Sequence, residues 1–211
     1  MASQDNRNSE LHLLFVRHGQ TRSNVERRYM GQSDSPLTPI GIAQAEALAK
    51  RLSKYRVDAI YSSDLGRAAR TSKIISQVCH LPVMYDKRLR ERHAGLLQGE
   101  LEVNARVKHA QVFAEITRMG AEYVFPGGGE SGLQIEERMA SFLDNMRENH
   151  SGETVVAITH GGILRVLLWH ILRFPYDGIF RLRCDNTSIS SLAFSDGQWI
   201  VEFWNDTAHL S

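Results

Sequence analysis

Basic side chains follow an apolar stretch near the start of the chain. Residues 13–16 are Leu-Leu-Phe-Val, and they lead directly into Arg17, His18 and Gly19. Strands of open α/β sheets present ligand-binding groups at their carboxyl ends. Arginine can hold phosphoryl oxygens in paired hydrogen bonds, neutral imidazole is a nucleophile near pH 7, and glycine lets an anion approach the backbone. Alone, the stretch is as typical of an ordinary strand followed by a charged turn as it is of an anion-binding site. A chemical role for it therefore depends on partners elsewhere in the chain.

A second histidine follows a second apolar stretch late in the chain. Residues 154–159, Thr-Val-Val-Ala-Ile-Thr, are apolar on both faces, as a central parallel strand should be, and they are followed by His160 and Gly161. The carboxyl ends of parallel strands meet at one edge of a sheet, so we expect His18 and His160 to lie close together. Arg67 begins a helix that also follows an expected strand, and its side chain can reach the same edge.

One acidic residue completes this set. Glu91 lies in a polar, glycine-containing segment that could cross the same sheet edge. A leaving alkoxide needs a proton and an attacking water needs a base, and one carboxylic acid can supply both. Neighbouring guanidinium groups should disfavour protonation of His18, whereas a bound phosphate acts in the opposite direction. The set therefore predicts phosphoryl transfer, with His18 as nucleophile and Arg17, Arg67 and His160 stabilising the transferred group.

The elements that position these residues alternate between strands and helices. This alternation predicts a three-layer α/β/α sandwich with a mostly parallel central sheet. The last two strands flank Asp196-Gly197, a hairpin signal, and can add an antiparallel edge. Thr38 and Pro39 are suited to begin a helix, residues 62–64 can cap the next one, and Pro82 favours an edge strand. Expected strands span residues 11–17, 57–61, 80–84, 154–159, 188–194 and 199–204, and expected helices span 39–54, 65–78, 102–120, 131–148 and a segment from 163.

The chain length predicts one domain. Its 211 residues can bury one substantial core, and we expect a single domain over residues 11–211, with an insertion at about 100–131 above the sheet end. Residues 1–10 are polar, lack the apolar core of a secretory signal, and are expected to form a disordered tail. Residues 24–35 are expected to form a loop without helix or strand.

Composition excludes several classes of partner. With 25 basic and 24 acidic residues, the net charge of +1 gives no drive toward nucleic acid or an anionic membrane, and the apolar stretches are too short to span a bilayer. Cys79 and Cys184 form no disulfide framework, which favours a reducing, cytoplasmic location. The nine histidines show no metal-ligand spacing, so no metal and no cofactor are expected. The protein is expected to be a monomer or a homodimer, in which the C-terminal strands could pair between subunits.

The motifs together resemble the histidine phosphatase superfamily, in its phosphoglycerate-mutase-like branch. They cover nearly the whole chain in the family's order, and the combination is far more specific than any one of them. The matching residues are 17–21 (Arg-His-Gly-Gln-Thr) with Asn24, 25–28 with Gly31, 34–38 with Gly41, 62–65 with Arg67 and Thr71, 89–92 with Gly95, 126–131 (Pro-Gly-Gly-Gly-Glu-Ser), 159–162 (Thr-His-Gly-Gly) and 186–189.

This resemblance implies a phosphoglycerate-mutase-like fold and a covalent mechanism that needs no metal. By the resemblance, His18 is phosphorylated, Arg17, Arg67 and His160 form the phosphate pocket with it, and Glu91 donates a proton and then acts as base. The substrate is expected to be a small-molecule phosphate ester. Further phosphate-binding residues are expected to be Thr21, Asn24, Gly31 and Gly161.

The branch contains phosphatases and mutases, which differ in whether water or a second substrate hydroxyl takes the phosphoryl group. Family mutases carry an arginine pair and a proline-rich segment in the insertion, whereas this insertion has only the single arginines Arg106 and Arg118. Ala94 stands where a family mutase has tyrosine. The loop at residues 126–131 resembles that of the phosphatase branches, which include fructose-2,6-bisphosphatases and broad-specificity phosphatases. We therefore expect a phosphomonoesterase for small phosphorylated metabolites. A cofactor-dependent phosphoglycerate mutase and a catalytically silent phospho-ligand-binding protein remain the alternatives.

Several residues near these motifs have competing interpretations. Met30 makes the expected pocket rim more apolar than in related phosphatases. Glu130 is interpreted as a structural residue, although it could touch substrate, and His93 is more simply an exposed loop residue than a pocket residue. Arg27 and Arg28, with Arg22, either attract an anionic substrate or form a solvated face.

Overall fold

A six-stranded sheet forms the centre of the molecule in this computed structural model, which describes residues 10–211. The expected tail at residues 1–10 therefore lies, except for its last residue, outside the described part of the chain. The strand order is β3-β2-β4-β1-β5-β6; β1 to β4 are parallel, and β5 is antiparallel to both β1 and β6. The strands are β1 (Leu11–Arg17), β2 (Ala59–Ser62), β3 (Val83–Tyr85), β4 (Thr154–Thr159), β5 (Ile189–Ser195) and β6 (Gln198–Asp206).

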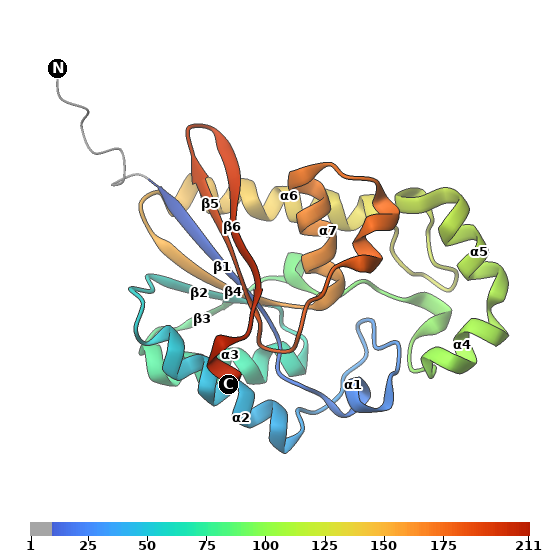
Figure 1. Ribbon diagram of the computed structural model, residues 1–211, viewed down its shortest axis with the longest axis horizontal. Coiled ribbons are helices and arrows are strands. Elements are labelled where there is room, and N and C mark those ends of the chain that lie inside the picture. The colour runs from blue at the N-terminus through green and yellow to red at the C-terminus, as the bar shows by residue number, and fades with distance from the viewer. Residues whose placement is uncertain (1–9) are drawn as a thin grey trace.

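Helices cover both faces of the sheet, and this confirms the predicted three-layer sandwich (Figure 1). Alternate residues of β1 enter two separate cores. Leu14 and Val16 pack with α2 and α3, whereas Leu13 and Phe15 pack with α6 and α7. Within residues 10–211, no helix combines the length and the apolar character needed to cross a membrane. The helices are α1 (Arg22–Glu26), α2 (Pro39–Leu52), α3 (Gly66–Cys79), α4 (Glu102–Lys108), α5 (Ala110–Met119), α6 (Gly132–Asn149) and α7 (Gly161–Leu172).

Most predicted elements are confirmed, including the edge position of β3 and the antiparallel hairpin of β5 and β6. The Thr38 hydroxyl caps α2 by accepting a hydrogen bond from the Gly41 N–H at 3.0 Å. Four expectations were wrong in detail. The expected helix at 102–120 is divided at His109, α7 begins at Gly161 instead of 163, and the loop at 24–35 begins inside α1. Residues 62–64 give no side-chain cap to α3, because the Asp64 carboxylate instead binds Arg90.

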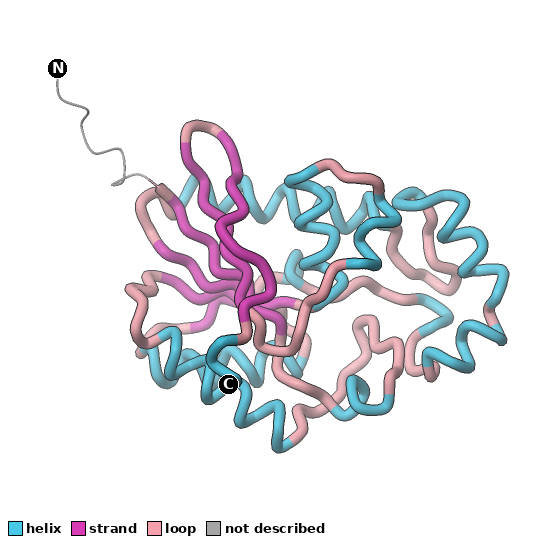
Figure 2. Tube along the Cα trace, viewed as in Figure 1, coloured by secondary structure: helices cyan, strands magenta, loops and turns pink. Residues whose placement is uncertain are grey.

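The expected insertion is attached to the loop that follows β1. Helices α4 and α5 lie away from the sheet, and their apolar side chains form a third buried cluster (Figure 1). Tyr29 packs against Phe113 with ring centroids 6.1 Å apart, and its N–H donates to the Glu100 carbonyl at 2.9 Å. Figure 2 shows loops filling the region between the sheet and α4 and α5. These contacts fix two loop segments, near residues 29 and 100, on one side of the carboxyl edge of the sheet.

Candidate active site

A cavity of about 830 Å³ lies at the carboxyl ends of the parallel strands. Its wall combines residues that follow β1, β2 and β4, so the parallel topology brings together segments far apart in the sequence. Of the residues predicted for the site, two are not among those that line the wall: His160, whose buried ring lies beside that of His18, and Thr21, which is fully buried elsewhere. The predicted residues that do line it are Arg17, His18, Asn24, Gly31, Arg67, Glu91 and Gly161.

His18 is held with one ring nitrogen free. Its Nδ1 lies 2.8 Å from the Gly19 carbonyl oxygen. A carbonyl oxygen can only accept a hydrogen bond, so Nδ1 must carry the proton and donate it. The other nitrogen, Nε2, then bears the lone pair. The imidazole is 4% exposed and lies on the cavity wall, so this orientation suits Nε2 as a nucleophile.

His160 lies beside His18, as the two strand ends predicted. The ring centroids are 5.1 Å apart, and His160 is fully buried. Its Nε2 lies 2.8 Å from the Ser63 hydroxyl, while its buried Nδ1 has no hydrogen-bond partner among residues 10–211. A buried polar nitrogen without a partner is costly, so Nδ1 is well suited to meet an oxygen of a ligand.

Both imidazoles are kept neutral in the ligand-free site. Burial lowers the pKa of His18 well below its ordinary value, and the positive charges of Arg67 and Arg17 lower it further. Burial is also the main reason that the pKa of His160 is lowered, with Arg67 the next cause. The sequence predicted the effect of the arginines, but desolvation of the imidazole is the larger cause.

Two arginines are held beside these rings by backbone carbonyls. Arg67 is 2% exposed, and its guanidinium donates to the Gly31 carbonyl at 2.7 Å and the Ser33 carbonyl at 2.8 Å. Arg17 donates through Nη1 to the Cys184 carbonyl, and its buried Nε has no partner in the described part of the chain. Neutral carbonyls orient the guanidinium groups without cancelling their charge, so the charge is available to an anion.

Glu91 is fixed at the first turn of α7. Its Oε2 accepts a hydrogen bond from the Gly162 N–H at 3.0 Å, and its Oε1 accepts one from the Arg92 N–H at 2.8 Å. A Cβ at position 162 would lie only 2.3 Å from Oε1, so any larger residue there would displace the carboxylate from this position. Each carboxylate oxygen keeps a second lone pair that can take a proton.

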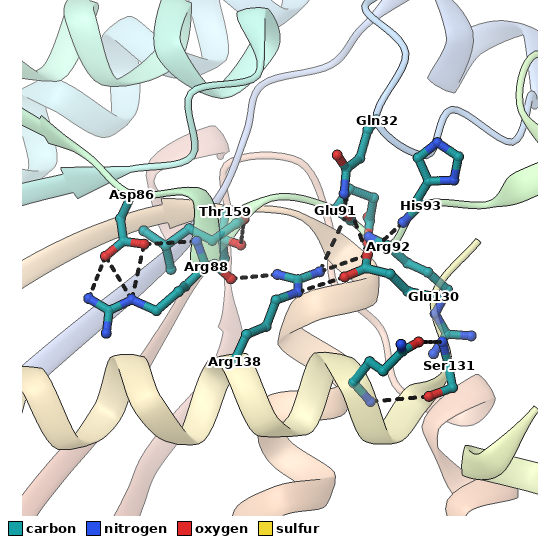
Figure 3. A network of polar contacts seen from close by, with 12 residues as sticks. Gln32, Asp86, Arg88, Glu91, Arg92, His93, Glu130, Ser131, Arg138 and Thr159 are labelled. Atoms are coloured by element: carbon teal, nitrogen blue, oxygen red, sulfur yellow. Dashed lines mark hydrogen bonds and ion pairs between the residues drawn. The ribbon is translucent and has the colours of Figure 1, made fainter. Parts of the chain in front are cut away.

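A polar network holds the segment that carries Glu91 (Figure 3). Arg138 reaches from α6, binds the Glu130 carboxylate at 3.1 Å, and donates to the Glu91 carbonyl at 3.5 Å. Gln32 donates to the same carbonyl at 3.1 Å. The His93 N–H donates to Glu130 at 2.8 Å, and the His93 ring does not line the cavity. Glu130 is thus a structural residue, as the sequence favoured.

Two residues of the first motif act differently from the prediction. The Thr21 hydroxyl caps α1 by accepting from the Asn24 N–H at 3.2 Å, so it is used inside the fold and does not reach the cavity. Asn24 lines the cavity as predicted; its side-chain oxygen accepts from the Thr21 N–H at 3.0 Å, which orients the NH2 group that a phosphoryl oxygen would need as donor. A Cβ on Gly19 would lie 2.5 Å from the Gly41 carbonyl, so this glycine serves packing against α2 and not the approach of an anion.

The sequence did not identify several residues on the wall or behind it. Ser63 contacts His160, and Arg92 stacks over Phe125 at 5.1 Å and donates to the Tyr176 hydroxyl at 2.6 Å. Arg165 also lines the cavity. The sequence does contain an indication of this position, because Arg165 is the only Asp, Glu, Lys or Arg in the otherwise apolar segment 161–172.

The arginines near the first motif divide between the cavity and a solvated face. Arg27 and Arg28 line the cavity, whereas Arg22 binds Glu26 at 2.9 Å on the surface. Across residues 10–211, no group of three His, Cys, Asp or Glu side chains is arranged to hold a metal ion.

Comparisons with known proteins agree with this geometry. The family model of the histidine phosphatase superfamily (branch 1) matches residues 13–207. A metal-independent phosphoserine phosphatase from Arabidopsis thaliana is 36% identical over 201 residues, covering 94% of this chain and 83% of that protein. A probable phosphoglycerate mutase, GpmB, from Yersinia pestis is 37% identical over 205 residues, covering 95% of each chain. A solved mycobacterial glucosyl-3-phosphoglycerate phosphatase, in complex with VO3, is 32% identical with a TM-score of 0.82, covering 92% of this chain and 98% of that chain.

The charge of Arg67 should be visible in the titration of both buried imidazoles. We expect NMR of the ring nitrogens to show neutral His18, protonated on Nδ1, down to a pH well below its ordinary pKa of about 6.5. Arg67→Gln removes a like charge, so it should raise the pKa values of His18 and His160. Arg67→Lys keeps the charge and is the matched control, with little change. Ordinary titration near pH 6.5 in the unmodified protein, or equal shifts in the two variants, would contradict this electrostatic account.

Proposed function

Because this chain belongs to branch 1 of the histidine phosphatase superfamily and is an enzyme acting on phosphoric monoesters, we propose that it hydrolyses small phosphomonoesters through a phosphohistidine at Nε2 of His18. One observation carries this proposal. Nε2 is the unprotonated nitrogen of a buried neutral imidazole, and His18 lines the cavity together with Arg17 and Arg67, which form no ion pair with a carboxylate of residues 10–211. A nucleophile and an anion pocket are thus present together.

In the first step, the lone pair of His18 Nε2 attacks phosphorus and the ester P–O bond breaks. Arg17 and Arg67 hold the phosphoryl oxygens as charge develops on them. Ser63 can donate its O–H to Nε2 of His160, which leaves the proton on Nδ1 for a further phosphoryl oxygen. The carboxylic acid of Glu91 gives its proton to the leaving alkoxide, so the alcohol departs neutral.

In the second step, water enters where the alcohol left. The Glu91 carboxylate takes a proton from this water, the water oxygen bonds to phosphorus, and the P–N bond breaks. The electron pair of that bond returns to Nε2, which restores the neutral His18. Glu91 is then protonated again for the next ester. The two backbone N–H groups that bind its oxygens keep the carboxyl group in one place for both roles.

The insertion favours water over a second substrate hydroxyl as the acceptor. Arg106 stacks over Phe113 at 5.2 Å, Arg118 binds Glu115 at 2.6 Å, and neither lines the cavity. The insertion therefore supplies no arginine pair of the kind that family mutases use. A silent phosphate-binding protein is also disfavoured, because binding alone does not require the fixed carboxylate of Glu91.

Removing the nucleophile tests the proposal. His18→Ala should lower kcat for p-nitrophenyl phosphate by at least about 1,000-fold, as loss of a covalent nucleophile does in other hydrolases. His12→Ala is the matched control, because His12 lies near the start of β1, whose other end leads into His18, and it should keep the native rate. With 3-phosphoglycerate, the unmodified enzyme should release phosphate faster than it forms the 2-isomer. Native hydrolysis by His18→Ala, or isomerisation that outpaces phosphate release, would contradict the proposal.

The proton donor is tested by varying the leaving group. An alkoxide needs a proton to leave, whereas p-nitrophenolate departs readily without one. Glu91→Gln should therefore lower kcat/KM, which reports formation of the phosphohistidine and not its later hydrolysis, by about 100-fold or more for glycerol phosphate and by about 10-fold or less for p-nitrophenyl phosphate, measured in parallel assays of product release. Equal losses for the two esters would show that Glu91 does not act as a general acid.

A further inference from the structure

We infer that Arg165 binds a second anionic group of the substrate, a carboxylate, while the site at His18 takes the phosphoryl group. The inference rests on the proposed function for the identity of the phosphoryl site. In this inference Arg165 determines which substrates bind, and it takes no part in the transfer of the phosphoryl group.

Arg165 projects into the cavity from a fixed helical position. It lies one turn after Gly161 on α7, and residues i and i+4 share one face of a helix. Helical side chains lean toward the N-terminus, so the guanidinium is directed back toward the turn that holds Gly161 and Gly162. Its presence on the cavity wall agrees with this direction.

The guanidinium of Arg165 is half-buried but has no counter-ion in residues 10–211. Its Nε donates to the Leu182 carbonyl at 3.1 Å, which fixes the plane of the group and leaves both terminal nitrogens available. Two of the three acidic residues on the cavity wall already have other partners. The Asp185 carboxylate binds Arg183 at 3.0 Å and Asn205 at 2.8 Å, and Glu91 accepts two backbone N–H groups.

The cavity as a whole has an excess of positive charge. Among the described residues on its wall are six arginines and three acidic residues, and Arg17 with Arg67 can match a phosphoryl dianion. Arg27 is exposed, so water solvates it, and Arg28 is already paired with Glu26 at 2.6 Å. Arg92 already donates to a phenol and stacks on Phe125. Arg165 is the half-buried arginine left to meet an anion. A carboxylate would match its planar fork with two parallel hydrogen bonds.

The size of the cavity leaves room for such a group. A volume of about 830 Å³ lies in the upper part of the range for drug-sized ligands and far exceeds the space that one phosphoryl group fills. The cavity wall also includes the apolar residues Met30, Ala94, Phe125 and Phe180. The substrate therefore extends beyond its phosphoryl group along a partly apolar wall, and a carboxylate on it can reach Arg165.

Phosphonates test this inference without turnover, because their C–P bond is not hydrolysed. The probes are 3-phosphonopropionate, 4-phosphonobutyrate and 5-phosphonopentanoate, each paired with the alkylphosphonate that has methyl in place of carboxylate. Calorimetric titration of the unmodified protein should show at least one carboxylated probe binding about 10-fold more tightly than its pair. Arg165→Gln should abolish that difference and leave the alkylphosphonate affinity within about 2-fold. Arg165→Lys, which keeps the charge without the fork, should retain part of it.

Other outcomes overturn the inference in distinct ways. Absence of any carboxylate preference in the unmodified protein would show that the cavity has no second anion site. If Arg165→Gln lowered the affinity for both members of a pair equally, this arginine would instead bind the phosphoryl group or stabilise the fold. Loss of the preference in Arg27→Gln instead of Arg165→Gln would assign the site to Arg27. Because these titrations require no hydrolysis, failure of the proposed function would appear separately, as normal activity of His18→Ala.

Discussion

Two neutral imidazoles buried against two guanidinium groups are the constraint on which the site depends. Burying arginine without a carboxylate is unfavourable, and the fold offsets this cost with the backbone carbonyls of Gly31, Ser33 and Cys184. The same burial and positive charge keep His18 and His160 unprotonated. An approaching phosphoryl group therefore meets a reactive nitrogen and a strong anion site at once. The loops after β1 and before β5 take their positions partly from these carbonyl contacts.

The acid–base residue depends on a different set of contacts. Glu91 is held by the first turn of α7 on one side and by Arg138 of α6 on the other (Figure 3). Both helices pack on the same face of the sheet, in the core that contains Phe15. The sheet positions His18 from one strand end, and this helical layer positions Glu91. Relative placement of nucleophile and proton donor thus depends on how one helical layer packs on the strands, which is the kind of rigid support that catalytic geometry needs.

Periodicity and parallel topology were enough to predict the main features of the fold and the centre of the site. The apolar strands, their shared carboxyl edge and the pairing of His18 with His160 required only the rule that parallel strands end together. Features fixed by contacts between distant segments could not be predicted in this way. The free nitrogen of His18 depends on one carbonyl, Thr21 serves as a helix cap, and the break at His109 has no proline or glycine to signal it. The sequence also does not show which arginines of the cavity form ion pairs with carboxylates, and the structure is needed to distinguish them.

The covalent intermediate is the central claim, and chemical trapping tests it most directly. The unmodified enzyme is mixed with a phosphate ester, quenched in alkaline denaturant within its first turnover, and digested for mass spectrometry under conditions that preserve acid-labile phosphohistidine. We predict phosphate on the peptide containing residues 17–19, on Nε2 of His18, with loss of the label in acid. A burst of product with no phosphorylated histidine, or phosphate on His160 instead of His18, would contradict the account.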